Sequence, residues 1–65
     1  MEIERKTSSN GTTYRIISWS CCYHTFYEIE FLKYAEVETD WWDLANGFIY
    51  NSLQEAKEIF NGLTK

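Results

Sequence analysis

Apolar and charged residues alternate strictly in the middle of the chain. From Tyr27 to Phe31 every odd position is apolar, while the even positions Glu28 and Glu30 are carboxylates. A period of two residues is typical of a β-strand with one buried face and one face in water. The sequence therefore predicts a strand here, with Glu28 and Glu30 on its solvent side.

The alternation continues through Glu36 and Glu38 to Asp40. One strand of that length would exceed the usual span, so we expect a bend or bulge near Lys33 and Tyr34.

Two consecutive tryptophans, Trp41 and Trp42, follow directly. In an extended chain, neighbouring side chains point to opposite faces of a sheet. We therefore expect one of them to enter the core and the other to point outward; the sequence does not distinguish which.

Three Asn-Gly pairs, at 10–11, 46–47 and 61–62, divide the rest of the chain, because both residue types tolerate a positive φ. The first pair lies between two stretches rich in β-branched and aromatic residues, Ile3 to Thr7 and Thr12 to Trp19. This pattern predicts two strands joined by a type I′ hairpin turn.

The C-terminal segment carries a helix signal. After the strand-like run Phe48 to Tyr50, Ser52 and Glu55 form the S-x-x-E capping box. We predict a helix from about Leu53 to Asn61 with Gly62 as its C-cap. Its apolar stripe consists of Leu53, Ala56, Ile59, Phe60 and Leu63.

These elements predict an α+β fold in a single domain, residues 1–65. The architecture is an antiparallel sheet of three or four strands with one C-terminal helix packed on one face. A chain of this size buries only about 60% of its unfolded surface. Twelve aromatic residues are more than such a core can enclose. Several should lie on the surface, where a partner or a homodimer would cover them.

Negative charge is concentrated in one stretch. Between residues 28 and 43, six carboxylates stand against the single base Lys33, a local charge of −5 in a chain of net charge −4. Such a field repels bare nucleic acid and attracts a basic protein surface. The alternative is a solvated face that only keeps the protein soluble. The predicted partner-binding residues are Glu28, Glu30, Glu36, Glu38, Asp40, Asp43, Trp41 and Trp42.

Cys21, Cys22 and His24 are the only cluster of soft metal ligands. A structural zinc site needs four ligands, so we expect no metal and no cofactor, with reduced, buried or half-buried thiols and a surface histidine. So short a chain also leaves little room for a substrate cleft. We therefore expect no catalytic residues and no enzymatic activity.

No apolar run approaches the roughly 20 residues that span a bilayer, and the N-terminal residues are charged. A cytoplasmic location is expected, in the host cell if the protein is encoded by a phage.

The junction from Gly47 to Ala56, GFIYNSLQEA, resembles that of the arm-type DNA-binding domain of phage integrases, where a sheet strand runs into an F-x-[ST]-x-x-E-A helix. The resemblance implies a similar fold. That family reads DNA with basic and polar residues on the exposed sheet face, whereas this chain places Glu28 and Glu30 there. No DNA-binding residue is carried over.

As a whole, this small, acidic, aromatic-rich chain resembles the inhibitors that phages and other mobile elements make against host nucleic-acid enzymes, including anti-CRISPR proteins. The resemblance implies that the six carboxylates act as a nucleic-acid mimic and occupy a basic channel. The alternative is a structural or regulatory module that dimerises or docks through Trp19, Trp41 and Trp42.

Overall fold

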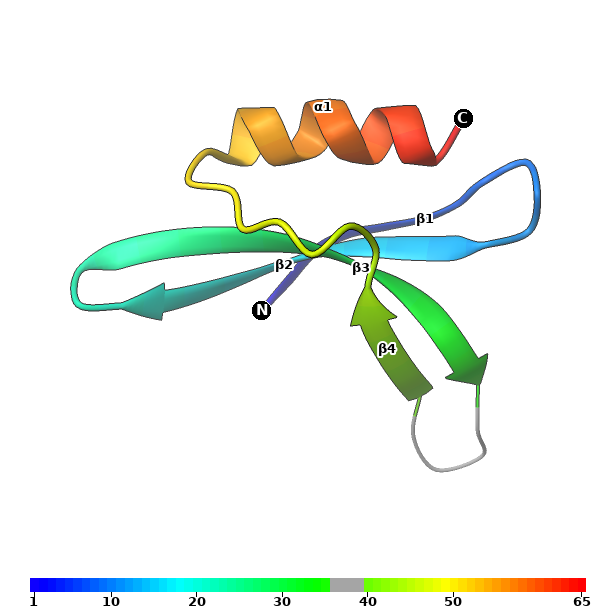
Figure 1. Ribbon diagram of the computed structural model, residues 1–65, viewed down its shortest axis with the longest axis horizontal. Coiled ribbons are helices and arrows are strands. Elements are labelled where there is room, and N and C mark those ends of the chain that lie inside the picture. The colour runs from blue at the N-terminus through cyan, green and yellow to red at the C-terminus, as the bar shows by residue number, and fades with distance from the viewer. Residues whose placement is uncertain (36–39) are drawn as a thin grey trace.

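The computed structural model contains four strands followed by one helix (Figure 1), and it describes residues 1–35 and 40–65. The elements are β1 (Glu2–Thr7), β2 (Thr13–Cys21), β3 (His24–Ala35), β4 (Asp40–Leu44) and α1 (Leu53–Leu63). The strands form one antiparallel sheet in the order β1-β2-β3-β4, so each strand pairs with its neighbour in sequence. The predicted α+β architecture is confirmed.

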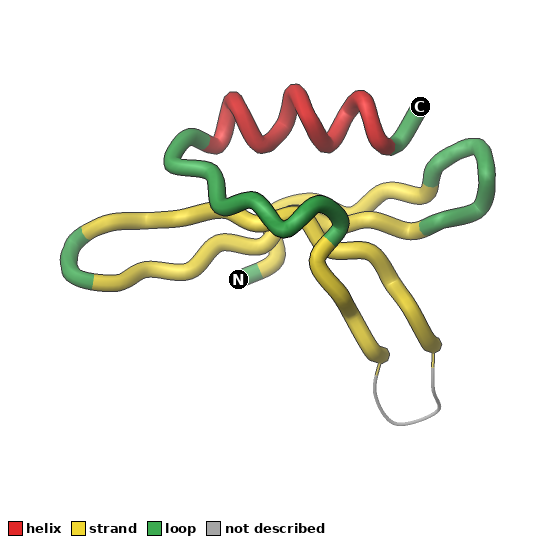
Figure 2. The backbone as a smooth tube through the Cα atoms, in the orientation of Figure 1, coloured by secondary structure: helices red, strands yellow, loops and turns green. Residues whose placement is uncertain are grey.

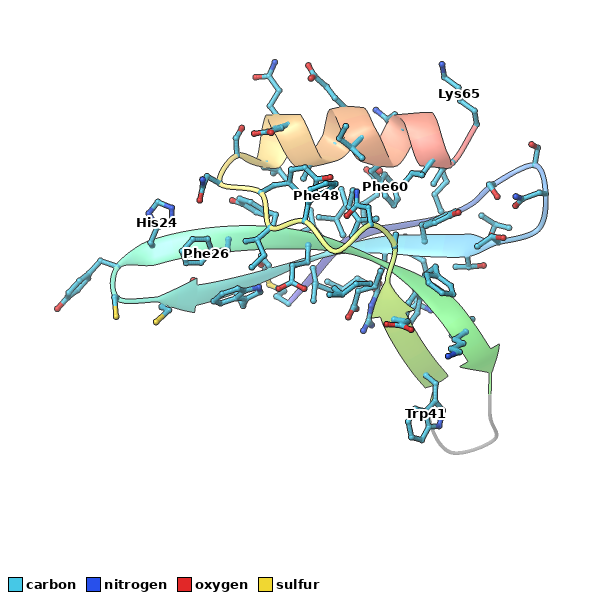
Figure 3. The ribbon with its side chains drawn as sticks, viewed as in Figure 1. His24, Phe26, Trp41, Phe48, Phe60 and Lys65 are labelled. Carbon is cyan, nitrogen blue, oxygen red and sulfur yellow. The ribbon has the colours of Figure 1, made fainter. Side chains whose placement is uncertain are left out.

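The core lies between α1 and one face of the sheet. Figure 2 shows the helix running along one side of the strands, and Figure 3 shows Phe60 between α1 and the sheet. Ile16 of β2 and Ile29 of β3 meet Ala56 and Phe60 of α1, and Tyr50 completes the buried cluster. The alternation in β3 therefore has the predicted sense, with Ile29 on the helix side.

The turn chemistry differs from the prediction at the first Asn-Gly pair. The β1–β2 loop has five residues between the paired Thr7 and Thr13. A type I′ turn needs a positive φ at both central residues, but within this loop only Gly11 has one, at +89°. The Asn10 side chain instead accepts a hydrogen bond from the Thr12 N–H at 3.0 Å, which stabilises a wider loop.

The tight turn of the sheet lies elsewhere, between β2 and β3. Cys21 pairs with His24, which leaves only Cys22 and Tyr23 in the loop. Their φ angles are +54° and +66°, as a type I′ turn requires. Both cysteines are exposed, contrary to the expected burial, because this hairpin extends past the end of the helix (Figure 1).

The bulge predicted in β3 is confirmed, since the register with β4 shifts between Leu32 and Tyr34. Beyond it, Trp41 is 56% exposed at the end of the hairpin far from α1 (Figure 3). Trp42 is half-buried but does not belong to the core. The expectation that one tryptophan enters the core is wrong, because Trp42 lies against Arg5 and Arg15 on the sheet face opposite α1, and Trp41 lies beyond the area that α1 covers.

The segment before the helix is not a strand. Only Tyr50 forms a bridge, with hydrogen bonds of 2.8 Å in both directions to Tyr27 of β3. Phe48 and Ile49 are exposed. They lie in the loop before α1, where Figure 3 labels Phe48.

The helix begins as predicted, since the Glu55 N–H donates to Ser52 Oγ at 3.4 Å. It continues through Gly62, and Thr64 rather than Gly62 is the C-cap: its N–H and hydroxyl donate to the Phe60 carbonyl at 3.0 and 2.9 Å. Leu63 extends the apolar stripe and favours this last turn. Ile59, predicted in the stripe, is 41% exposed.

Candidate protein-binding face

The sheet face opposite α1 carries side chains from all four strands. Ile16 points toward the helix, so Arg15 and Ile17 point away from it. Paired residues share a face, which extends the set across the sheet. We call this set the open face: Glu2, Arg5, Arg15, Ile17, Trp19, Phe26, Glu28, Glu30, Leu32, Trp42 and Leu44. None of the elements within residues 1–35 and 40–65 packs over it (Figure 1).

The centre of the open face is a cluster of arginines around one indole, with Glu2, Arg5, Arg15, Glu30 and Trp42 as its members. The guanidinium carbon of Arg15 lies 4.0 Å from the centre of the Trp42 ring, and that of Arg5 lies 4.9 Å from it. Such cation–π contacts attract each guanidinium to the face of the ring. Trp42 is therefore half-buried beside two positive charges.

Two carboxylates neutralise these arginines. Arg15 donates to Glu30 Oε1 through Nε at 2.8 Å, its Nη2 forms an ion pair with the same oxygen at 2.8 Å, and its Nη1 lies 3.5 Å from Glu2. Arg5 donates to Glu2 through Nη2 at 2.7 Å and through Nε at 3.1 Å. The cluster is one continuous network that joins β1, β2, β3 and β4.

The network makes the stability weakly dependent on pH. Hydrogen bonds from Arg5 lower the pKa of Glu2, partial burial opposes this shift, and the positive charges of Arg5 and Arg15 reinforce it. A lowered folded-state pKa stabilises the protein above the ordinary glutamate pKa of about 4.3, and this stabilisation is lost as pH falls through the folded-state value.

We therefore expect Glu2→Gln to lower the free energy of unfolding by at most about 1 kcal/mol at neutral pH, since the pair is solvent-exposed. The difference from the wild type should shrink as pH falls through the lowered folded-state pKa of Glu2 and should vanish once that carboxyl is protonated in both the folded and the unfolded state. Urea titrations at several pH values measure it. A difference that stays constant from neutral to acidic pH would contradict the network.

A second group lies nearer the β2–β3 turn. Trp19 packs on Phe26, with ring centroids 4.7 Å apart, and its Nε1–H donates to Glu28 Oε1 at 2.7 Å. The hydrogen bond fixes the orientation of the indole, although the side chain remains exposed. Trp19 therefore presents a rigid aromatic surface on the open face.

Two members of the predicted acidic array, Glu28 and Glu30, have partners within the protein. Glu28 accepts the indole hydrogen bond, and the Glu30 side chain is only 15% exposed because Arg15 covers it. Neither carboxylate is a freely solvated group on the water side of β3. Sequence reasoning counted charges along one stretch and missed the partners that β2 supplies from fifteen and nine residues away.

Asp43 is the described carboxylate of that array that does not belong to the open face. Asp43 is exposed, 3.9 Å from Lys33, and accepts a hydrogen bond from the Leu44 N–H at 2.9 Å. Asp40 begins β4, and the predicted residues Glu36 and Glu38 lie outside the described residues. Trp41 belongs to the face of β4 opposite Trp42.

Sequence reasoning also missed Arg5, Arg15, Phe26 and Leu44 as members of this surface. One signal was present: in the strand predicted from Thr12 to Trp19, residues 15, 17 and 19 alternate with Ile16, which is buried in the structure. Their common face follows from this period alone.

The described part of the chain contains no pocket and no group of three His, Cys, Asp or Glu residues that would hold a metal ion. Its one helix is too short and too polar to cross a membrane. A scan against protein-family models finds no match, and searches of curated proteins and of solved structures find none either.

Proposed function

We propose that this protein is a protein-binding domain that docks a basic partner through the open face. The observation that carries the proposal is the pair of fixed aromatic groups, around Trp19 and Trp42, on a sheet face that no described element covers. Tryptophan and arginine dominate the residues that contribute most to binding at protein interfaces. The open face offers both.

The geometry favours binding at modest cost. Trp19 is held by Glu28 and Phe26, and Trp42 by Arg5 and Arg15, so these side chains lose little freedom when a partner arrives. Preorganisation of this kind raises affinity because less ordering entropy is lost on association. The internal pairing of the arginines also means that the face needs no opposite charge from its partner.

The partner's charge is inferred from the whole chain. A net charge of −4 steers a basic protein toward the domain and slows the approach of an acidic one. Nucleic acid is disfavoured for a further reason: Arg5 and Arg15, the basic residues of the open face, already bind Glu2 and Glu30. A phosphate would have to displace those carboxylates.

An inhibitor of a nucleic-acid enzyme, as in anti-CRISPR proteins, is a narrower form of the same proposal. In that form the basic partner is such an enzyme, and the open face supplies the contact while the acidic residues supply the steering. The internal pairing of Glu28 and Glu30 lends more support to aromatic docking than to phosphate mimicry by an array of six carboxylates.

Capture from a lysate of the cells that make this chain tests the proposal. We expect Trp19→Ala to weaken binding of the main partner about thirtyfold, the loss that corresponds to about 2 kcal/mol at a central aromatic. Phe48→Ala is the matched control, because Phe48 is a 65% exposed aromatic on the loop before α1. The control should bind like the wild type, and the recovered partner should be basic and bind more weakly as salt rises.

Titration of the labelled domain with the purified partner, followed by NMR, then locates the contact. Shifts concentrated at Arg15, Ile17 and Trp42 are expected. Shifts concentrated around Lys57 and Glu58, on the exposed side of α1, would refute docking through the open face. Sedimentation of the domain without a partner tests self-association. A dimer that is lost in Trp19→Ala would show that a second copy of this chain, and not a basic partner, covers the open face.

A further inference from the structure

The β2–β3 turn holds two thiols side by side. Cys21 is the last residue of β2 and Cys22 is the first residue of the turn. Their Sγ atoms are 3.4 Å apart, and both residues are exposed. Neither cysteine belongs to the network of Glu2, Arg5, Arg15, Glu30 and Trp42 on the open face.

The backbone of the turn brings the two sulfur atoms together. Consecutive side chains in a regular strand point to opposite faces, which would separate two neighbouring cysteines. Cys22 instead has a φ of +54°, a left-handed conformation that few residues other than Gly, Asn and Asp adopt. This conformation places its thiol beside that of Cys21.

We propose that Cys21 and Cys22 are a reversible redox site, which a small-molecule disulfide such as oxidised glutathione converts to an internal disulfide. One cysteine thiolate attacks a sulfur of oxidised glutathione, forms a mixed disulfide and releases one glutathione thiolate. The second cysteine thiolate then attacks the mixed disulfide at the sulfur of the first cysteine. The Cys21–Cys22 bond forms, the second glutathione leaves, and two cysteine protons pass to the released thiolates.

The same geometry predicts that the bond is easily reduced again. Neighbouring Cα atoms are about 3.8 Å apart, whereas disulfides usually join Cα atoms about 4.4–6.8 Å apart. The internal disulfide is therefore strained, and strained, exposed disulfides are the labile ones. The site is thus a switch between two states and adds no permanent cross-link.

Intact-mass measurement of the full chain after exposure to oxidised glutathione tests the proposal. The wild type should lose two hydrogens, retain no glutathione and recover both thiols in dithiothreitol. Cys21→Ser and Cys22→Ser, checked for folding by circular dichroism, should each retain one glutathione. On the wild type, the mixed disulfide should decay at least about tenfold faster than on either variant, because the second thiol acts within the molecule.

Two results would overturn the proposal. One is a wild type that accumulates one or two stable glutathione adducts, with decay no faster than in the single variants. The other is oxidation mainly to disulfide-linked dimers. Either would show that the two thiols react as independent surface groups.

Discussion

Phe60→Ala is expected to unfold most of the protein under conditions in which the wild type is folded. Phe60 is fully buried at the centre of the contact between α1 and the sheet. Truncation of such a side chain costs about 3–5 kcal/mol. A domain of this size has only roughly 0.05–0.15 kcal/mol of stability per residue. Urea titration followed by circular dichroism measures the loss.

Its neighbour in the helix supplies the control. Ile59→Ala removes a comparable apolar group at a position that is 41% exposed, so we expect a change within about 0.5 kcal/mol. Equal destabilisation by the two variants would show that α1 packs on the sheet through a different face.

Arg15→Ala is expected to cost about 1–3 kcal/mol, the second largest effect. It removes the hydrogen bond and the ion pair that Arg15 makes with the carboxylate of Glu30, whose side chain is only 15% exposed. Loss of a charge-assisted hydrogen bond accounts for this cost, and water that enters beside the shorter alanine side chain offsets part of it. The cost stays below that of a fully buried pair because the Arg15 side chain is itself 23% exposed.

A second substitution separates the charge from the packing. Adding Glu30→Gln to Arg15→Ala should recover part of the lost stability, since a neutral amide tolerates this site better than an unpaired carboxylate. Arg5→Ala is the control, with an expected cost of about 0–1 kcal/mol, because the Arg5 side chain is 45% exposed. No recovery in the double variant would mean that Arg15 acts only by covering Trp42.

Local signals predicted much of the fold. The alternation around Ile29 and the cap at Ser52 depend on neighbouring residues, and both have the predicted structure. The turn at Cys22 and Tyr23 could not be predicted in the same way, because neither is a residue type that favours a positive φ. There the pairing of β2 with β3 imposes the backbone conformation.

The candidate site was harder to predict, because it depends on register. Glu30 is shielded only because β2 pairs so that Arg15 stands opposite it. A shift by one residue would turn Arg15 toward the helix and leave Glu30 in water. Register follows from the position of the β2–β3 turn, which the sequence did not reveal, so the charge count alone predicted an open acidic array.

The order β1-β2-β3-β4 has a consequence for the kinetics of folding. Each strand pairs with the one next to it in sequence, so every hairpin closes a short loop and loses little chain entropy before its contacts form. Among the pairs of described elements that pack together, α1 on β2 and α1 on β3 are the ones that are not neighbours in sequence. The sheet can therefore assemble hairpin by hairpin, with helix docking as the step most sensitive to residues such as Phe60.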